Sequence, residues 1–553
     1  MNLRIGMGAL SGLLIVALHA ATAAEHRHAA VPSPGGEAIY LRGELGSGAT
    51  LQGTRAGGLT VQGAKAACVN CHLRSGLGST EGAVTIPPIT GEYLFHDRAG
   101  PGSNEHALMY VENAHGNREP YTDQTLARAI RAGLNSEGQP LSVLMPRFDL
   151  GDADMSTLVE YLKGLDRRRV PGVSDTELQF ATIVTPDADP VKHRGVIDVL
   201  NQYFVDKNLF PFPPSPRMRT SGATLYSKSM YIANRRWQLH VWELTGPAAT
   251  WRAQLEQDFA REPVMAVISG LAGSDWAPVH DFCEQRRVPC LFPNVEAPPT
   301  GRADFYTVYL SRGVLLEANL IDNELLAAGD TRPVHTVRQI YRRGDSGEVA
   351  AQALATQLQA QGVTVLDHKL PPVGKAGETV AQALRAGPAD AWVLWLRPGD
   401  LATLEGAPPE SARLFVSGLL GGLEQAPLPG PWRERARLTY PVDLPDKRVV
   451  RVDYPLGWFR LRHVEIVDAR VQADTYLACG ILAETLHHMA DIISPEYLVE
   501  QLQETLEHRI LTGYYPRLSL APGQTVGSKG AYWVRFADAT GSRIVADSGW
   551  VVP

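Results

Sequence analysis

The stretch Cys68-Val69-Asn70-Cys71-His72 is the most specific pattern in this chain of 553 residues. It reads C-x-x-C-H, the attachment signature of a c-type haem. One helical turn can carry two thiols to the vinyl groups of a porphyrin edge and turn the next imidazole toward the iron. A zinc site would need two further ligands at short spacing, and none follows. The pattern predicts one covalently bound haem c, attached through Cys68 and Cys71, with His72 as an axial iron ligand.

The first 23 residues have the features of an export signal. Arg4 supplies a positive charge, residues 5–18 are apolar, and Ala21-Thr22-Ala23 offers a cleavage site near Ala24. An uncleaved membrane anchor is the alternative, but glycines in the apolar stretch and the small-residue site favour cleavage. Because c-type haem is attached on the outer face of the bacterial inner membrane, the signal and the haem motif both predict a periplasmic protein.

The composition is that of an ordinary water-soluble protein, with 44% hydrophobic and 20% charged residues and a formal net charge of -7. Such a balance offers no broad basic surface, so nucleic acid is not expected as a partner. No stretch after the signal approaches the about 18 uncharged apolar residues of a membrane span. The length exceeds what one hydrophobic core supports, so about two or three domains are expected.

Residues 36–166 resemble class I cytochrome c. The likeness lies in an N-terminal helix, the C-V-N-C-H motif, the segment Met145-Pro146-Arg147-Phe148, and a closing helix that reads D-A-D-M-S-T-L-V-E-Y-L-K. It implies an all-α domain in which Met145, just before the last helix, is the second axial ligand. Methionine and histidine together close the iron to substrates, which favours single-electron transfer over catalysis.

Other residues compete with that methionine for the second axial position. His96, His106 and His115 lie between the motif and the last helix, and any one of them could give a bis-histidine haem. An open or weakly held sixth site is the other alternative. Met109 and Met155 fall inside predicted helices and are expected in the core.

A charged segment with a proline and a glycine, residues 167–176, predicts a linker. From residue 177 to the end the pattern changes to alternating strands and helices. This order predicts parallel sheets with helices on both faces, arranged as a two-lobed α/β module with a cleft.

This module, residues 177–553, resembles type I periplasmic solute-binding proteins of the branched-chain amino-acid class. The likeness is carried by three segments in order: V-I-S-G-L-A-G-S (267–274), R-V-P-C-L-F-P (287–293) and A-D-T-Y-L-A-C-G-I-L-A-E-T-L (473–486). It implies that a small polar solute binds between the lobes, with backbone N–H groups at helix N-termini holding its carboxylate.

The sequence departs from that family where the ligand would bind. The resemblance implies small hydroxyl residues in two loops of the first lobe; Ser274 keeps this character, but Glu296 would repel a carboxylate. Arg343-Gly344-Asp345-Ser346-Gly347 lacks the aromatic residue expected in the second lobe. Ser274 and Glu296 are therefore the candidate cleft residues, and ordinary solvated loop residues are the alternative reading.

The combination predicts a periplasmic electron carrier, not an enzyme, whose solute-binding-like module docks a partner or senses a substrate. A quinoprotein alcohol dehydrogenase is the candidate redox partner by analogy. The alternative is a solute-binding or redox- or gas-sensing protein with a regulatory haem. Cys283 and Cys290 could form a disulfide in an oxidising compartment, or serve as two small buried hydrophobic residues.

Overall fold

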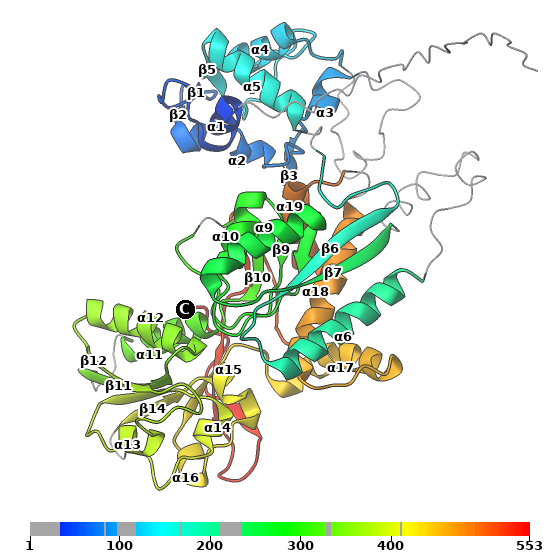
Figure 1. Cartoon of the computed structure of the whole chain (residues 1–553). Coiled ribbons are helices and arrows are strands. Elements are labelled where there is room, and N and C mark those ends of the chain that lie inside the picture. Colours follow the sequence, from blue (N-terminus) through cyan, green and yellow to red (C-terminus); the bar gives the residue numbers. More distant parts are fainter. Residues whose placement is uncertain are drawn as a thin grey trace, which may run out of the picture.

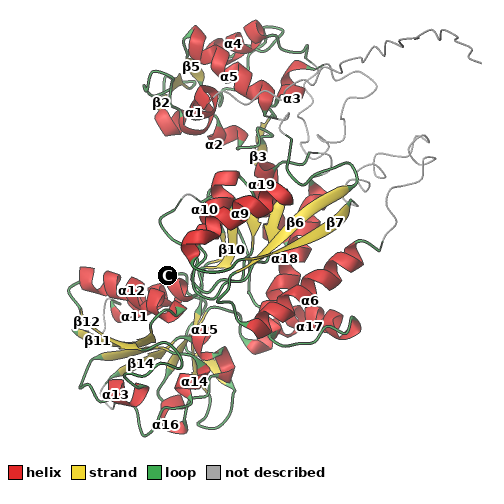
Figure 2. Ribbon diagram, viewed as in Figure 1, coloured by secondary structure: helices red, strands yellow, loops and turns green. Residues whose placement is uncertain are grey.

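The computed structural model describes an N-terminal unit and a larger two-lobed α/β module (Figures 1 and 2). The described residues are 34–81, 84–96, 118–165, 169–209, 235–302, 304–327, 333–409, 412–489 and 492–553. The predicted signal peptide, His106, His115 and Met109 lie outside these ranges. Among the described helices, none has the length and apolar character needed to cross a membrane.

The N-terminal unit is built around two crossing helices. A side-chain carbon on Gly36 would lie 2.3 Å from the carbonyl oxygen of Thr157, so only glycine allows this close approach. The Tyr40 ring packs at a tilt against the Tyr161 ring, with ring centroids 5.3 Å apart. The helices of this unit are α1 (Pro34–Arg42), α2 (Val69–His72), α3 (Gly91–Phe95), α4 (Asp123–Ala132) and α5 (Asp152–Gly164).

The prediction that this unit is all-α is wrong. Three short strands pair in the antiparallel order β2-β1-β5, and a hairpin joins β3 to β4. Gly53 lets the Phe148 ring of the neighbouring strand pack closely over the central strand, because a side-chain carbon there would lie 3.0 Å from that ring. The strands are β1 (Gln52–Thr54), β2 (Thr60–Gln62), β3 (Ser79–Glu81), β4 (Val84–Ile86) and β5 (Arg147–Asp149).

Lobe 1 of the α/β module is a six-stranded parallel sheet in the order β16-β10-β9-β8-β6-β7. Buried apolar side chains cover both of its faces, as a parallel sheet requires. Its strands are β6 (Glu177–Val184), β7 (Arg236–Glu243), β8 (Ala266–Ile268), β9 (Cys290–Leu291), β10 (Thr307–Ser311) and β16 (Val526–Ser528). Its helices are α6 (Pro190–Lys207), α9 (Trp251–Arg261) and α10 (Ala277–Arg286). Cys283 and Cys290 are buried in this lobe as free thiols.

Lobe 2 is a seven-stranded sheet in the order β12-β11-β13-β14-β15-β17-β18, with its last two pairings antiparallel. Its strands are β11 (Thr336–Arg342), β12 (Thr364–Leu370), β13 (Ala391–Trp395), β14 (Arg413–Val416), β15 (Arg437–Tyr440), β17 (Tyr532–Phe536) and β18 (Ile544–Ala546). Its helices are α11 (Val314–Leu325), α12 (Ser346–Ala360), α13 (Val380–Leu384), α14 (Pro398–Leu401), α15 (Gly418–Gly421) and α16 (Gly430–Arg433). The predicted two-lobed α/β architecture is confirmed.

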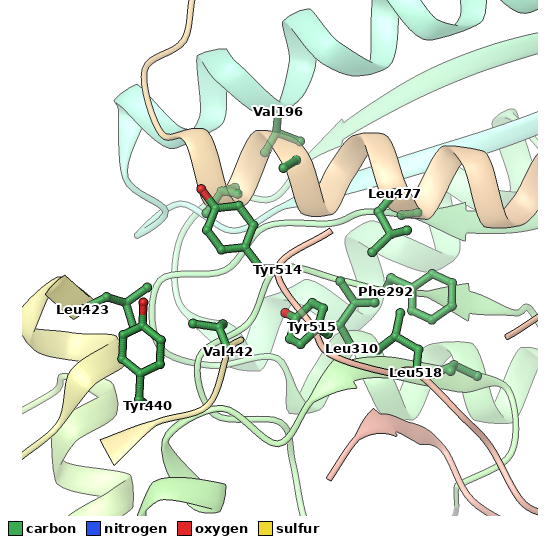
Figure 3. Packing of buried hydrophobic residues seen from close by; sticks show 14 of the residues in the cluster. Val196, Phe292, Leu310, Leu423, Tyr440, Val442, Leu477, Tyr514, Tyr515 and Leu518 are labelled. Atoms are coloured by element: carbon green, nitrogen blue, oxygen red, sulfur yellow. The ribbon is translucent and has the colours of Figure 1, made fainter. Parts of the chain in front are cut away.

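The chain passes from lobe 1 to lobe 2 after β10, returns after β15 and crosses again after β16. Three long helices lie between the last two crossings: α17 (Pro445–Leu461), α18 (Ala469–His488) and α19 (Pro495–His508). Helix α18 packs against α6 of lobe 1 and against α19. One apolar cluster continues from lobe 1 into lobe 2: Figure 3 shows Phe292 and Leu310 on one side, Val442 between, and Tyr440 on the other. The crossing segments are therefore part of a core and not loose connections.

Candidate functional site

A cavity of about 510 Å³ lies between the lobes. Its wall comes from loops that follow the parallel strands of both lobes and from the first turns of α6 and α18. Ligands of open α/β sheets bind outside the carboxyl ends of the strands, and the volume suits a small molecule. The cavity is the candidate ligand cleft.

Ser274 lines this cleft, as the sequence predicts, but its hydroxyl is already engaged. The hydroxyl donates to Asp187 Oδ2 at 2.5 Å, and the Ser274 backbone N–H donates to the same oxygen at 2.9 Å. Burial opposes ionisation of Asp187, yet the hydrogen bonds from Ser274 and Thr185 lower its pKa. Asp187, from the loop after β6, thus takes the donors that a ligand carboxylate would need.

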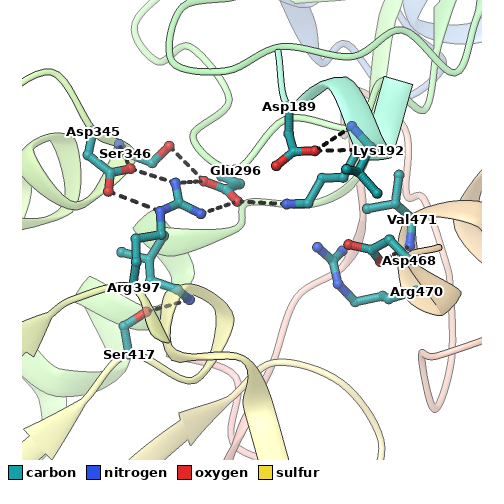
Figure 4. A network of polar contacts seen from close by, with 12 residues as sticks. Asp189, Lys192, Glu296, Asp345, Ser346, Arg397, Ser417, Asp468, Arg470 and Val471 are labelled. Atoms are coloured by element: carbon teal, nitrogen blue, oxygen red, sulfur yellow. Dashed lines mark hydrogen bonds and ion pairs between the residues drawn. The ribbon is translucent and has the colours of Figure 1, made fainter. Parts of the chain in front are cut away.

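Glu296 also lines the cleft, where it connects the two lobes (Figure 4). Its carboxylate accepts two hydrogen bonds from Arg397 of lobe 2, at 2.9 and 2.6 Å, and one from the Ser346 hydroxyl at 2.9 Å. Arg397 in turn donates to Asp345 at 3.0 and 2.5 Å. Burial raises the pKa of Glu296, but Arg397 outweighs it and holds the pKa at about 2. The alternative reading of Glu296 as a solvated loop residue is wrong.

The start of α18 adds charged residues that the sequence interpretation missed. Arg470 Nη1 donates to Asp474 Oδ2 at 3.3 Å, and the Tyr515 hydroxyl donates to the same oxygen at 3.3 Å. Asp474 is 2% exposed, and its Oδ1 has no hydrogen-bond partner among the described residues. Burial raises the pKa of Asp474 to about 7. The available signal is an Arg–Asp pair at i,i+4 at the start of this helix.

The predicted haem residues lie together in the N-terminal unit. Cys68 is the N-cap of α2, and His72, 7% exposed, ends that helix. The His72 Nδ1 lies 3.0 Å from the carbonyl oxygen of Pro87, which can only accept, so Nδ1 is the protonated nitrogen. Burial lowers the pKa of His72 to about 4, which keeps the imidazole neutral. A neutral imidazole oriented through one nitrogen is the usual form of a metal ligand, so these residues fit a haem iron.

The candidates for the second axial position separate in the structure. Met145 is half-buried and packs against the same apolar cluster as Cys68, just before β5. Met155 is buried on α5, as expected for a core residue. His96 is the C-cap of α3, half exposed and 3.8 Å from Glu92. Met145 as the second axial ligand remains a prediction.

The N-terminal unit contacts lobe 1 directly beyond His72. The backbone N–H groups of Arg74 and Ser75 donate to Glu500 Oε1 of α19 at 2.6 and 3.2 Å. The Arg74 guanidinium lies 4.2 Å from the ring centroid of Phe305. Arg287 forms an ion pair with Glu37 at 2.6 Å.

No protein-family model matches the chain, and the search of curated proteins gives no match either. Similar solved structures include a putative branched-chain amino acid ABC transporter from Rhodospirillum rubrum, with 16% identity, 68% of this chain and 99% of that chain covered, and a TM-score of 0.44. A substrate-binding periplasmic protein from Ralstonia solanacearum has 14% identity, 67% and 100% coverage, and a TM-score of 0.47. The branched-chain amino acid binding protein LivJ from Streptococcus pneumoniae, in complex with isoleucine, has 12% identity, 68% and 100% coverage, and a TM-score of 0.45. Similarity at this level does not identify a ligand for this chain.

The fold corrects the classification of the whole chain as an electron-transfer cytochrome. The two-lobed module with its cleft, and not the N-terminal unit, makes up most of the described residues. Nothing in the described part of the chain supports a quinoprotein dehydrogenase as a partner.

Proposed function

We propose that this chain is an exported, non-catalytic binding protein for a small polar solute. The observation that carries the proposal is the cavity of about 510 Å³ at the strand ends of two lobes, lined by charged side chains from both. Polar groups placed around a cavity of this size fix the orientation of a small ligand. Periplasmic delivery of the solute to a membrane transporter is the role that the descriptions of similar structures suggest.

The cleft differs from a plain amino-acid site. The donors of Ser274 are taken by Asp187, and Glu296 is held by Arg397. A ligand carboxylate at Ser274 would displace an existing carboxylate and face Glu296 nearby. The solute therefore has to use other groups of the cleft.

We infer that the N-terminal unit carries a covalent haem c on Cys68 and Cys71, with His72 and Met145 as axial ligands. Pro87 orients His72 through Nδ1, and the buried setting keeps the imidazole neutral. The haem would supply an iron centre whose redox state or sixth ligand responds to the surroundings. Because Arg74 and Ser75 bind Glu500 of α19, its role is regulatory toward the binding module.

A panel of alcohols, amino acids and small acids, screened by thermal shift, tests the binding function. A ligand at 100 times its dissociation constant adds about 2.7 kcal/mol to the stability of the folded state. A shift with one chemical class supports the proposal, and a flat response to the whole panel refutes it.

The cofactor is tested separately with the full chain expressed alongside a haem-attachment system. Haem stain that survives denaturing electrophoresis is expected for the natural chain and for Cys479→Ala, a control that removes a buried thiol far from the motif. Cys68→Ala/Cys71→Ala should lose the stain. Stain absent from the natural chain, or retained in the double variant, overturns the assignment.

A further inference from the structure

At one end of the cleft the charged side chains are paired with one another: Asp187 accepts hydrogen bonds from Ser274, and Glu296 and Asp345 both accept from Arg397. At the other end, where α6 and α18 begin, the charged groups are less well paired. Its cations have weak partners, and one buried carboxylate oxygen has none in the described residues.

Two cations belong to this end. The Lys192 ammonium, in the first turn of α6, is 3.7 Å from Glu296, whose oxygens are already bonded to Arg397. Arg470, in the first turn of α18, makes one hydrogen bond of 3.3 Å to Asp474, although a guanidinium has several N–H donors. Figure 4 shows both side chains extending from their helices toward the cleft. The N-terminus of each helix is already capped by an aspartate carboxylate, Asp189 in α6 and Asp468 in α18, so the positive charge at this end comes from the two side chains.

Asp474 supplies an independent sign of a missing ligand. Its side chain lines the cavity, yet its Oδ1 is buried and lacks a hydrogen-bond partner in the described part of the chain. A buried polar atom of this kind is costly unless a ligand or water completes it. The oxygen can accept a hydrogen bond from a hydroxyl, and Arg470 lies on the same helix one turn earlier.

We propose that this end of the cleft binds a small hydroxy acid, with its carboxylate on Arg470 and Lys192 and its hydroxyl donating to Asp474 Oδ1. The inference rests on the proposed binding function and adds the substrate class. Lys192 and Arg470 are the cations beside the proposed ligand, and a neutral hydroxyl adds no charge next to them. The α-ammonium of an amino acid would bring a third positive charge close to both.

Four probes that differ by one group test the assignment on the full chain by isothermal titration calorimetry. They are 2-hydroxy-4-methylpentanoate, its amide, 4-methylpentanoate and leucine. The hydroxy acid should bind best; loss of the carboxylate or of the hydroxyl should weaken binding about tenfold or more. Leucine binding equal to or tighter than the hydroxy acid overturns the inference but leaves solute binding intact.

Variants locate the site. Arg470→Gln should weaken hydroxy acid binding by about 30-fold, since a charged hydrogen bond to the ligand is lost. Arg543→Gln, at an exposed arginine of lobe 2 outside the cleft lining, should leave it unchanged. Lys192→Gln is a second variant, expected to weaken binding about tenfold, should Arg470→Gln fail to fold. Equal affinities in the Lys192 and Arg543 variants refute this site, whereas no binding by any probe or by the wider panel refutes the proposed function itself.

Discussion

Glu296→Gln should weaken the contact between the two lobes, because it removes the charge of the side chain while keeping its shape. In the folded protein Arg397 lowers the pKa of Glu296 from 4.5 to about 2, and the side chain is 18% exposed. This difference corresponds to about 3 kcal/mol in favour of the ionised carboxylate. Because the partners belong to different lobes, the loss should fall on the contact between the lobes.

The pH dependence has a definite sign. A depressed folded-state pKa stabilises the protein fully above about 4.5, and this contribution is lost as the pH falls toward 2. The stability difference between the natural chain and Glu296→Gln should therefore be about 3 kcal/mol at pH 7 and less than half of that at pH 3.

Urea unfolding followed by tryptophan fluorescence measures this difference, and small-angle X-ray scattering reports opening of the cleft. Glu434→Gln is the matched control, because Glu434 is an exposed glutamate of lobe 2. Equal unfolding midpoints for the two variants at pH 7, or a difference that does not shrink between pH 5 and pH 3, would show that the Glu296–Arg397 contact does not stabilise the lobes.

Two further substitutions test the packing around the sites. Glu500 is 8% exposed, and burial raises its pKa to about 7. Because a buried carboxylate has to ionise as the pH rises, the free energy of unfolding of the natural chain should fall by about 3 kcal/mol between pH 5 and pH 8. Glu500→Gln keeps the Oε1 acceptor and should remove most of this pH dependence, which urea midpoints at both pH values measure. Identical pH profiles would contradict the burial of an ionisable group there. Gly313 has φ +57, and a side-chain carbon would lie 1.9 Å from the Glu296 carbonyl oxygen. Gly313→Ala should therefore cost about 3 kcal/mol, against about 1 kcal/mol for the unobstructed Gly362→Ala, and equal costs would show that the steric contact does not matter.

The features that the sequence predicts well are those with local signals. The closing helix of the N-terminal unit and the alternation of strands and helices in the larger module are each readable within a short window. The all-α expectation failed because strands of three residues pair at long range, as Gln52 does with Asp149. A glycine-rich stretch reads as a loop until the partner strand is known.

The candidate site follows the same division. Ser274 was placed in the correct loop, because strand–loop–helix order is local. Its hydrogen bond to Asp187 forms because two neighbouring strands end side by side, although the two residues are 87 positions apart in the sequence. Glu296 was expected to repel a ligand, but its partner Arg397 is 101 residues away and in the other lobe. Charge partners across a cleft have no spacing rule, so a single sequence does not predict them.

Two packed helices, α18 and α19, join the cleft to the predicted haem site. Helix α18 begins at the cleft with Arg470, and the Thr485 hydroxyl near its other end donates to Thr505 of α19 at 3.1 Å. Helix α19 carries Glu500, which binds the backbone just after His72. A shift of α18 on ligand binding would therefore reach the residues that follow His72 through packed side chains, without involving the linker. This continuity supports the proposal that a haem bound there is regulatory toward solute binding.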